Sequence, residues 1–351
     1  MTRSDEPTRL ANVIMNLFRD QSVATKQVVA DEGSTVDLIA GADAQDDCAV
    51  FRMSGDQELV VGSDYVRGPK FRLYEMGHLT EYDLGYYLAA ANVSDIAAMG
   101  AHPIGLLSVV RYPADMSDET FESIMQGIKD ACRRFRCPNI GGDIGSAERL
   151  ILSATALGTC RRGGALFRSG AKPGDLVCVT APTGFAGAAM EYLRAQRPDP
   201  AIDELHLATL LASWRRPSAR VDEGIALAAC GRVTSCQDTS DGLKATVECL
   251  AAASGVGITI FEDSVPLPEP VAAVAHHLRL DPLGLVFGDS VDFELAFTAP
   301  PDAVEQLRQE MALHAIGEVT DSGSAVMLGS NGELTSLPGK AWRHVPDQAG
   351  R

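Results

Sequence analysis

The 351-residue sequence is short of positive charge, of tryptophan and of long apolar runs. It has 30 lysines and arginines against 47 aspartates and glutamates, which gives a formal net charge of −17 at pH 7. An acidic surface repels nucleic-acid phosphates and anionic lipid, so we expect neither nucleic acid nor a membrane as a partner. No apolar stretch is long enough to span a bilayer, and the opening residues place acids and arginine where a signal peptide needs an apolar core. We therefore predict a cytoplasmic protein.

Several common motifs are also missing. The eight cysteines include no C-x-x-C pair and lie mostly in apolar runs, as expected for buried, reduced thiols. There is no G-x-x-x-x-G-K-[ST] sequence, which excludes a P-loop kinase or ATPase. The glycine-containing run at 177–189 lacks the first G-x-G of a dinucleotide-binding fold and is interpreted as a tight turn with close helix packing.

What is present is an ordinary globular composition, with 46% hydrophobic and 22% charged residues. The length suggests two domains, and a turn-rich, charged stretch at 161–175 places the boundary near residue 160. Alternating strand and helix signals predict an α/β fold, with a layered α/β second domain. The expected strands are 58–62, 104–110, 150–157, 176–180, 257–261 and 293–298; the expected helices are 10–18, 84–99, 117–135, 187–194 and 302–313; and 139–143 is expected to be a tight turn.

Aspartates placed beside small residues, rather than opposite lysine or arginine on helices, are the chemical signal of the sequence. They are Asp46, Asp47, Asp64, Asp95, Asp143, Asp238 and Asp241. Asp95 falls on an apolar helix, where an unpaired carboxylate is costly. Hard divalent cations are the natural partners of such carboxylates, because no histidine or cysteine cluster has the spacing of a transition-metal site. A group of carboxylates completed by metal ions and a polyphosphate would form a nucleotide site.

The simpler interpretation of each aspartate is a helix cap or a turn former, which is a routine role for this residue. For any single position that interpretation is the better one. Six or more such positions together favour the metal site, although sequence alone does not show that they converge.

The motifs that carry these aspartates resemble those of thiamine-monophosphate kinases. More distantly they are similar to aminoimidazole ribonucleotide synthetase, selenophosphate synthetase and the hydrogenase-maturation dehydratase. The resemblance covers nearly the whole chain. Its most specific segments are Asn92-Val-Ser-Asp-Ile-Ala-Ala-Met-Gly-Ala101, Gly141-Gly-Asp143, Arg168-Ser-Gly-Ala-Lys-Pro-Gly-Asp175, Arg216-Pro-Ser-Ala-Arg220 and Asp238-Thr-Ser-Asp-Gly-Leu243.

The resemblance implies an ATP- and Mg²⁺-binding dimerisation domain over 1–160 and a C-terminal α/β domain over 161–351. The small sheet of the first domain would pair with that of a second copy to form a barrel, so a homodimer is expected. Position by position, the implied metal ligands are Asp47, Ser63, Asp64, Asp95, Asp143, Asp238 and Asp241, and the implied ATP contacts are Gly142, Asp143, Arg168 and Ser240. Asp64 and Asp241 take the catalytic roles, with Asp241 as the base if the acceptor is a neutral hydroxyl.

The substrate side departs from the family pattern. The loop after Asp64 is one residue shorter and has Lys70 where a substrate-contacting histidine is usual, with Arg67 close by. Val291 replaces a substrate-contacting acid, and an aromatic-Asp-His pattern becomes Trp342-Arg-His. The basic loop favours an anionic acceptor, and we predict a small anionic metabolite other than thiamine monophosphate. The alternative, of nearly equal weight, is that these basic side chains pair with surface acids and that thiamine monophosphate is held by its phosphate alone.

The sequence thus predicts an ATP-dependent phosphotransferase acting on a small molecule. The first alternative is an ATP-dependent ligase or dehydratase that activates an amide or carboxylate oxygen by phosphorylation. The second is a non-catalytic nucleotide-binding scaffold, which is disfavoured because a scaffold has no reason to retain every metal carboxylate.

Overall fold

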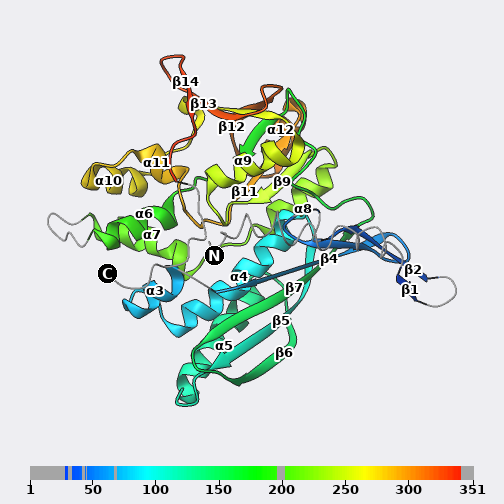
Figure 1. Cartoon of the computed structure of the whole chain (residues 1–351), viewed down its shortest axis with the longest axis vertical. Coiled ribbons are helices and arrows are strands. Elements are labelled where there is room, and N and C mark those ends of the chain that lie inside the picture. Colours follow the sequence, from blue (N-terminus) through cyan, green and yellow to red (C-terminus); the bar gives the residue numbers. More distant parts are fainter. Residues whose placement is uncertain are drawn as a thin grey trace, which may run out of the picture.

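Two seven-stranded sheets, one from each half of the chain, organise the computed structural model (Figure 1). The structure describes residues 28–30, 34–41, 44, 46–66, 69–195 and 202–340. The helix expected at 10–18 lies outside these residues. None of the described helices is long and apolar enough to cross a membrane.

The first sheet has the strand order β1-β2-β3-β4-β7-β5-β6 and is open, with β1 and β6 at its edges. Its strands are β1 (Val28–Ala30), β2 (Ser34–Ala40), β3 (Ala49–Arg52), β4 (Gln57–Tyr65), β5 (His102–Tyr112), β6 (Asn139–Ser146) and β7 (Ile151–Arg161). Strands β4, β7 and β5 agree with the strands predicted at 58–62, 150–157 and 104–110. The tight turn predicted at 139–143 is wrong: these residues begin β6, which pairs in parallel with β5. Their glycines disguise a strand, because glycine is depleted in strands and enriched in turns.

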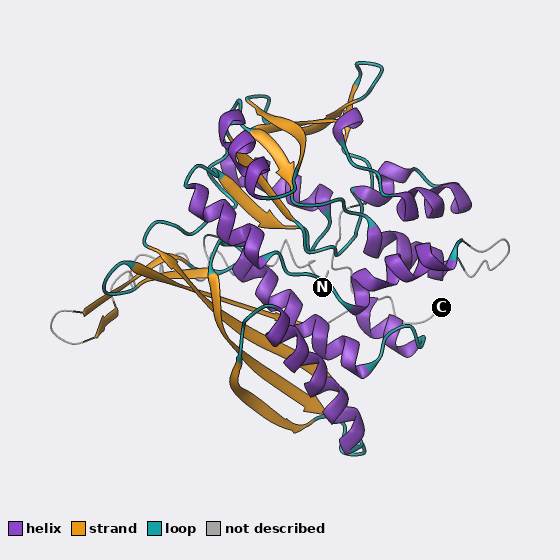
Figure 2. Cartoon of the chain, turned by 180° about the vertical axis from the view of Figure 1, so that it is seen from behind, coloured by secondary structure: helices purple, strands orange, loops and turns teal. Residues whose placement is uncertain are grey.

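Two helices cover the inner face of this sheet, α4 (Glu81–Ala98) and α5 (Asp118–Arg134) (Figure 2). A capping box between Thr80 and Asp83 begins α4, and Ser117 caps α5. The two helices pack closely through glycines: a Cβ on Gly85 or Gly127 would lie 2.0 Å from a backbone oxygen of the other helix. α4 is therefore buried on most sides, which suits its Ala-rich sequence.

The outer face of the first sheet carries partly exposed apolar side chains. Side chains of β7 alternate strictly between buried and partly exposed, as expected for a strand covered on one face only. Tyr65, Leu107 and Ile151 on this outer face are 46%, 37% and 41% exposed. Edge strand β6 is exposed along almost its whole length. Both features leave apolar surface and backbone groups uncovered within the described chain.

The second sheet has the order β14-β13-β10-β12-β8-β11-β9. Its strands are β8 (Leu176–Val179), β9 (Ser235–Asp238), β10 (Gly257–Phe261), β11 (Leu295–Ala299), β12 (His314–Thr320), β13 (Ala325–Leu328) and β14 (Leu334–Ser336). The helices of this half are α6 (Phe185–Arg194), α7 (Glu204–Arg215), α8 (Val221–Cys230), α9 (Leu243–Ser254), α10 (Glu269–Leu278), α11 (Pro282–Val286) and α12 (Pro301–Glu310). The mixed α/β class and the two sheet-containing halves predicted from the sequence are confirmed.

Helix α4 joins the two halves. It packs on β4 and β7 of the first sheet and also touches α7, α8 and β9 of the second half (Figure 1). The contact with α8 is close enough that a Cβ on Gly224 would lie 2.1 Å from the carbonyl oxygen of Ala97. The C-terminal part of α4 is therefore fixed between the two sheets, and Asp95 lies in this part.

Candidate metal and nucleotide site

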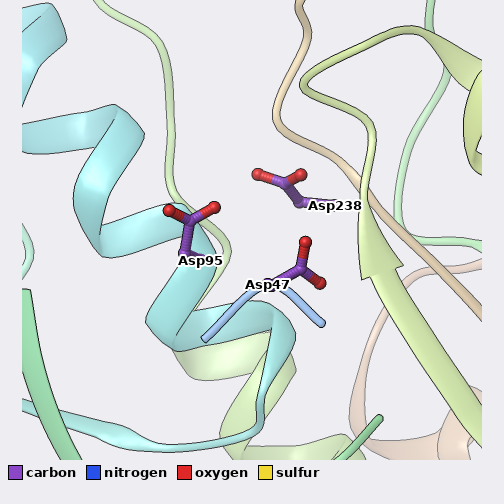
Figure 3. A group of neighbouring side chains, drawn as sticks. All are labelled: Asp47, Asp95 and Asp238. Atoms are coloured by element: carbon purple, nitrogen blue, oxygen red, sulfur yellow. The ribbon is translucent and has the colours of Figure 1, made fainter. Parts of the chain in front are cut away.

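Three of the predicted aspartates meet where α4 approaches the second sheet. One carboxylate oxygen from each of Asp47, Asp95 and Asp238 lies within 4.8 Å of the others. Figure 3 shows the three side chains converging from α4, from the end of β9 and from the segment before β3. We call these three residues the carboxylate cluster. Each member comes from a different motif, and Asp47 and Asp238 are 191 positions apart in the sequence, so only folding brings the three together.

Asp238 is held in place by hydroxyl groups. Its side chain is fully buried at the end of β9, and its carboxylate accepts hydrogen bonds from Ser94 Oγ and Ser240 Oγ, both at 2.6 Å. The Thr246 hydroxyl donates to its backbone carbonyl at 3.0 Å. Ser94 precedes Asp95 on α4, so a single turn of this helix contributes both a carboxylate and the hydroxyl that orients another.

Asp47 is paired with a cation. The Arg168 guanidinium donates to its carboxylate at 2.5 Å, and the side chains are 24% and 2% exposed. Asp46 in turn accepts the backbone N–H of Arg168, at 3.2 Å to Oδ2. The two adjacent aspartates therefore orient Arg168 through its side chain and its backbone.

The electrostatics of the carboxylate cluster favour a bound cation. Burial raises the pKa of Asp95 well above its usual value, and the charges of Asp238 and Asp47 raise it further. Burial raises the pKa of Asp47 to about 7, against the lowering effect of Arg168. Burial also raises the pKa of Asp238, although its hydroxyl partners oppose the shift. Neighbouring carboxylates in a buried site resist ionisation unless a positive charge joins them.

The residues present fit a hard divalent cation. The Asp47 Oδ2 atom is buried and has no hydrogen-bond partner among the described residues, so one lone-pair-bearing oxygen is left for a ligand. Three carboxylates and nearby hydroxyls form the all-oxygen donor set that Mg²⁺ prefers. No cysteine ligand belongs to the cluster, and the protein's eight cysteines are free thiols, six of them buried.

Asp64 lies next to the cluster and Ser63 faces away from it. The Asp64 backbone N–H donates to Asn92 Oδ1 at 2.9 Å, and the Asp64 charge raises the pKa of Asp95. Successive side chains of β4 point to opposite faces. Ser63 accordingly lies on the outer face, where its hydroxyl donates to the carbonyl of Ala154 at 2.7 Å.

Asp143 is not brought to the cluster within one chain. Asp64 pairs across the sheet with Ala154, Ala154 with Ser108, and Ser108 with Gly142. Three strand spacings of about 4.8 Å put Asp64 and Gly142 roughly 14 Å apart. Asp143, one residue further, points to the outer face, where it is 62% exposed and pairs with Arg111 at 2.5 Å.

Gly142 occupies a position that only glycine fits. Its φ is +141°, and a Cβ there would lie 1.7 Å from the Ser108 carbonyl oxygen. Gly142, Asp143, Asn139 and Lys129 line a cavity of about 440 Å³ between β6 and α5. This cavity is separate from the carboxylate cluster.

The remaining predicted residues divide between the cluster and undescribed parts of the chain. Ser240 bonds to Asp238, and Asp241 lies exposed in the following turn, where its charge raises the pKa of Asp238. Val291 is 8% exposed and packs in the core. Arg67 and Trp342 lie outside the described residues, and Lys70 belongs to α3 (Pro69–Glu75) without a described side chain.

The residues that orient the carboxylates are not among the predicted site residues. Ser94 and Asn92 belong to a family-like motif that predicts no role for them, and Asp46 is not among the predicted ligands or contacts. A signal was available: Asn92 and Ser94 are polar residues in an otherwise apolar helix, and both prove fully buried. A buried polar side chain needs a hydrogen-bond partner, and here each partner belongs to a segment that carries one of the predicted aspartates.

The fold is that of the AIR synthase-related proteins. Residues 45–160 match the model of the AIR synthase related protein N-terminal domain, and residues 172–329 match that of the C-terminal domain.

Comparison with individual proteins identifies the family within this class. The chain is 32% identical over 268 residues to a thiamine-monophosphate kinase from Pyrococcus abyssi, covering 76% of this chain and 80% of the relative. It is 30% identical over 319 residues to that of Bacillus subtilis, covering 89% and 94%. The solved structure of AaThiL complexed with AMPPCP and TMP superposes with a TM-score of 0.74 at 25% identity, covering 86% of this chain and 91% of that one. The chain belongs to the thiamine-monophosphate kinase family.

Proposed function

We propose that the carboxylate cluster binds Mg²⁺ and the phosphates of ATP, and that the protein transfers the γ-phosphoryl group to a small phosphate-bearing acceptor. Membership of the family makes the chain an ATP-dependent kinase. The observation that carries the proposed site is the convergence of Asp47, Asp95 and Asp238 around an unpartnered Asp47 oxygen.

Bound Mg²⁺ would reduce the negative charge on the phosphate oxygens of ATP and favour in-line attack of the acceptor oxygen on the γ-phosphorus, with ADP as the leaving group. The chain's own groups hold and orient these partners. Ser94 and Ser240 keep both oxygens of Asp238 fixed, so this carboxylate needs little reorganisation when a cation binds. Arg168 is a partly exposed cation beside Asp47, which suits contact with a phosphate oxygen.

Asp241 follows the cluster on an exposed turn. We propose that it faces the acceptor. A phosphate acceptor is already an anion at pH 7 and needs no proton removed, whereas a neutral hydroxyl acceptor would use Asp241 as its base. Asp64, beside Asp95, is proposed as a further metal ligand.

Thiamine monophosphate is the first candidate acceptor. Its support is the identity of 30% or more with relatives that bear this activity in their names. Thiamine monophosphate would direct its phosphate toward the carboxylate cluster and its cationic thiazolium ring toward the predicted substrate-binding residues.

The second candidate is another small anionic metabolite, as the substrate-side sequence predicts. The comparisons give this prediction no support. One structural observation favours it: Val291 is apolar and packs in the core, so this position presents no acid to a thiazolium ring.

We further propose a homodimer in which Asp143 completes the cluster of the second copy. The outer face of the first sheet exposes Leu107 and Ile151, and β6 offers an unpaired edge. Asp143 points to this same face, on the sheet's far side from Asp64. Pairing two such sheets would cover the apolar face and bring Asp143 and Gly142 of one copy toward the other's cluster.

Two organisational predictions belong here as well. We propose the division into 1–160 and 161–351, supported by the first sheet ending at Arg161 and the second beginning at Leu176. We also propose a cytoplasmic location, supported by eight free cysteines in a protein with no disulfide among its described residues.

The test is product analysis with ATP, Mg²⁺ and thiamine monophosphate. A kinase yields ADP and thiamine diphosphate in equal amounts. Free phosphate together with a new carbon–nitrogen bond would instead indicate the ligase chemistry of the distant relatives. ATP binding without any product would indicate a scaffold, or a different acceptor if a metabolite panel then yields one.

A further inference from the structure

Lys244 lies at a junction of three segments beside the proposed acceptor side. Its ammonium group donates to the carbonyl oxygens of Leu337 at 2.8 Å and of Gly339 at 3.1 Å. Its backbone N–H donates to the carbonyl of Phe287 at 3.0 Å. One residue therefore connects the start of α9 to the end of α11 and to the segment that follows β14.

The position of this lysine is unusual for a helix. Lys244 is the second residue of α9, and the first turn of this helix contains no acidic residue. A cation in the first turn is unfavourable, because the N-terminal end of a helix already carries partial positive charge. Two accepting carbonyls offset this cost, and they come from a segment more than ninety positions away in the sequence.

Glycines allow the three segments to touch. Gly242 has a φ of +88°, and a Cβ there would lie 2.0 Å from the carbonyl oxygen of Gly288. Gly339 has a φ of +78°, and a Cβ there would lie 2.7 Å from the carbonyl oxygen of Gly284. The backbone of the C-terminal segment is thus packed directly against the end of α11.

One of these segments leads into the proposed acceptor side. Asp241 lies three residues before Lys244 in the turn that follows Asp238. The junction is separate from the metal ligands, because Asp238 is held by Ser94, Ser240 and Thr246 and not by Lys244.

We propose that Lys244 is a positioning residue that holds segment 337–339 against the turn at 241–244 and thereby sets the geometry of the acceptor side of the active site. The predicted effect of Lys244 on turnover rests on the proposed function, whereas its attachment to segment 337–339 is a property of the fold. Lys244 does not contact the reacting atoms. Its loss should disturb acceptor binding and leave binding of Mg²⁺ and ATP intact.

The first test is limited proteolysis with trypsin, which needs no substrate. Cleavage after Lys340 requires residues 337–339 to leave their contacts with Lys244 and α11. Lys244→Met should raise the rate of this cleavage at least about fivefold, because local opening sets the rate, while cleavage after Arg308 in α12 stays unchanged. Lys244→Arg keeps donors for both carbonyls and should restore most of the protection. Lys172→Met, which removes an exposed lysine, is the matched control.

The second test is steady-state kinetics with thiamine monophosphate. Lys244→Met should raise the KM for thiamine monophosphate about tenfold or more, since small displacements of positioning groups have large effects. The Kd for ATP with Mg²⁺, measured by calorimetry, should stay within about twofold of wild type because the cluster is untouched. Lys244→Arg should recover most of the KM.

The outcomes separate this proposal from the function on which it rests. Unchanged trypsin cleavage in Lys244→Met overturns the attachment, and an unchanged KM, or an equal loss of ATP affinity, overturns the positioning role. If wild-type protein does not phosphorylate thiamine monophosphate, the acceptor is wrong. The proteolysis rate then decides the role of Lys244 alone.

Discussion

Ser94 on α4 donates a hydrogen bond to the carboxylate of Asp238 at the end of β9, at 2.6 Å between oxygens. The two residues are 144 positions apart, and both are buried. This bond crosses from the helix of the first half to the sheet of the second. Asp95, which follows Ser94 on α4, and Asp238 therefore keep their relative positions whenever the two halves are packed together.

Replacing Ser94 with alanine should weaken both the fold and the site. A lost hydrogen bond to a charged group costs about 1.5–3 kcal/mol of unfolding free energy. Orienting partners of metal ligands typically contribute about 10–100-fold in affinity, so ATP binding with Mg²⁺ should weaken to this extent. Urea unfolding and calorimetry measure the two effects. Ser94→Thr keeps the hydroxyl and is the control; ATP affinity unchanged in Ser94→Ala would contradict the role.

Replacing Asp95 with asparagine should separate activity from stability. Turnover should fall by at least about 100-fold, because a carboxylate proposed to bind the metal is removed. The metal-free protein should be as stable as wild type or more so, since one of three clustered charges is gone. Asp56→Asn, at an exposed aspartate, is the control for both measurements. A strongly destabilised Asp95→Asn protein would mean that this carboxylate has a structural role.

The carboxylate cluster should make stability depend on pH in a defined direction. Burial raises the pKa of Asp47 to about 7, from an ordinary value of 3.8, and the pKa values of Asp95 and Asp238 are raised as well. The folded state then binds more protons than the unfolded state between about pH 4 and 7. Without divalent cations, the free energy of unfolding should therefore fall as pH rises through this window, by up to about 1.4 kcal/mol per pH unit for each such group.

Mg²⁺ should reverse this trend, because it binds the deprotonated carboxylates. The increase in Tm on adding Mg²⁺ should be larger at pH 8 than at pH 5, measured against samples containing EDTA. Asp47→Asn should reduce the pH dependence of the metal-free protein. An Mg²⁺ effect that is equal at both pH values would exclude these carboxylates as the binding groups.

Charging the outer face of the first sheet should dissociate the proposed dimer. Leu107→Lys or Ile151→Lys would place an ammonium group in the apolar surface between the two copies, where an unpaired buried charge is costly. Light scattering should then give about the monomer mass of 37.2 kDa, with turnover lost if Asp143 acts across the interface. Leu205→Lys, at a 73% exposed position on α7, should leave the dimer intact. A wild-type protein that is already monomeric at micromolar concentration would contradict the dimer.

Much of this architecture could be predicted from local sequence signals. The apolar alternation of 150–157 and the Ser117 cap identify a strand and a helix without tertiary information. The strand at 139–146 could not be found in this way. Its glycines favour a turn locally, and only pairing with β5 and the close approach of Gly142 to Ser108 make them a strand.

The candidate site, like the fold, could be predicted only in part from local sequence signals. The types and motifs of the aspartates indicated a metal site, because unpaired carboxylates on apolar segments need a cation. Which of them meet could not be predicted: Asp143 lies three strands away from Asp64 and on the opposite face, a fact set by sheet order and register. The role of Ser94 likewise depends on how α4 packs against β9.

The most direct test of the account follows the γ-phosphoryl group itself. Wild-type protein is incubated with γ-labelled ATP, Mg²⁺ and thiamine monophosphate, alongside Asp238→Asn and an EDTA-treated sample. The account predicts that label appears in thiamine diphosphate in a one-to-one ratio with ADP, and that both the variant and the chelated enzyme are nearly inactive. Label transfer that persists in Asp238→Asn, or that proceeds without a divalent cation, would show that the carboxylate cluster is not the site of phosphoryl transfer.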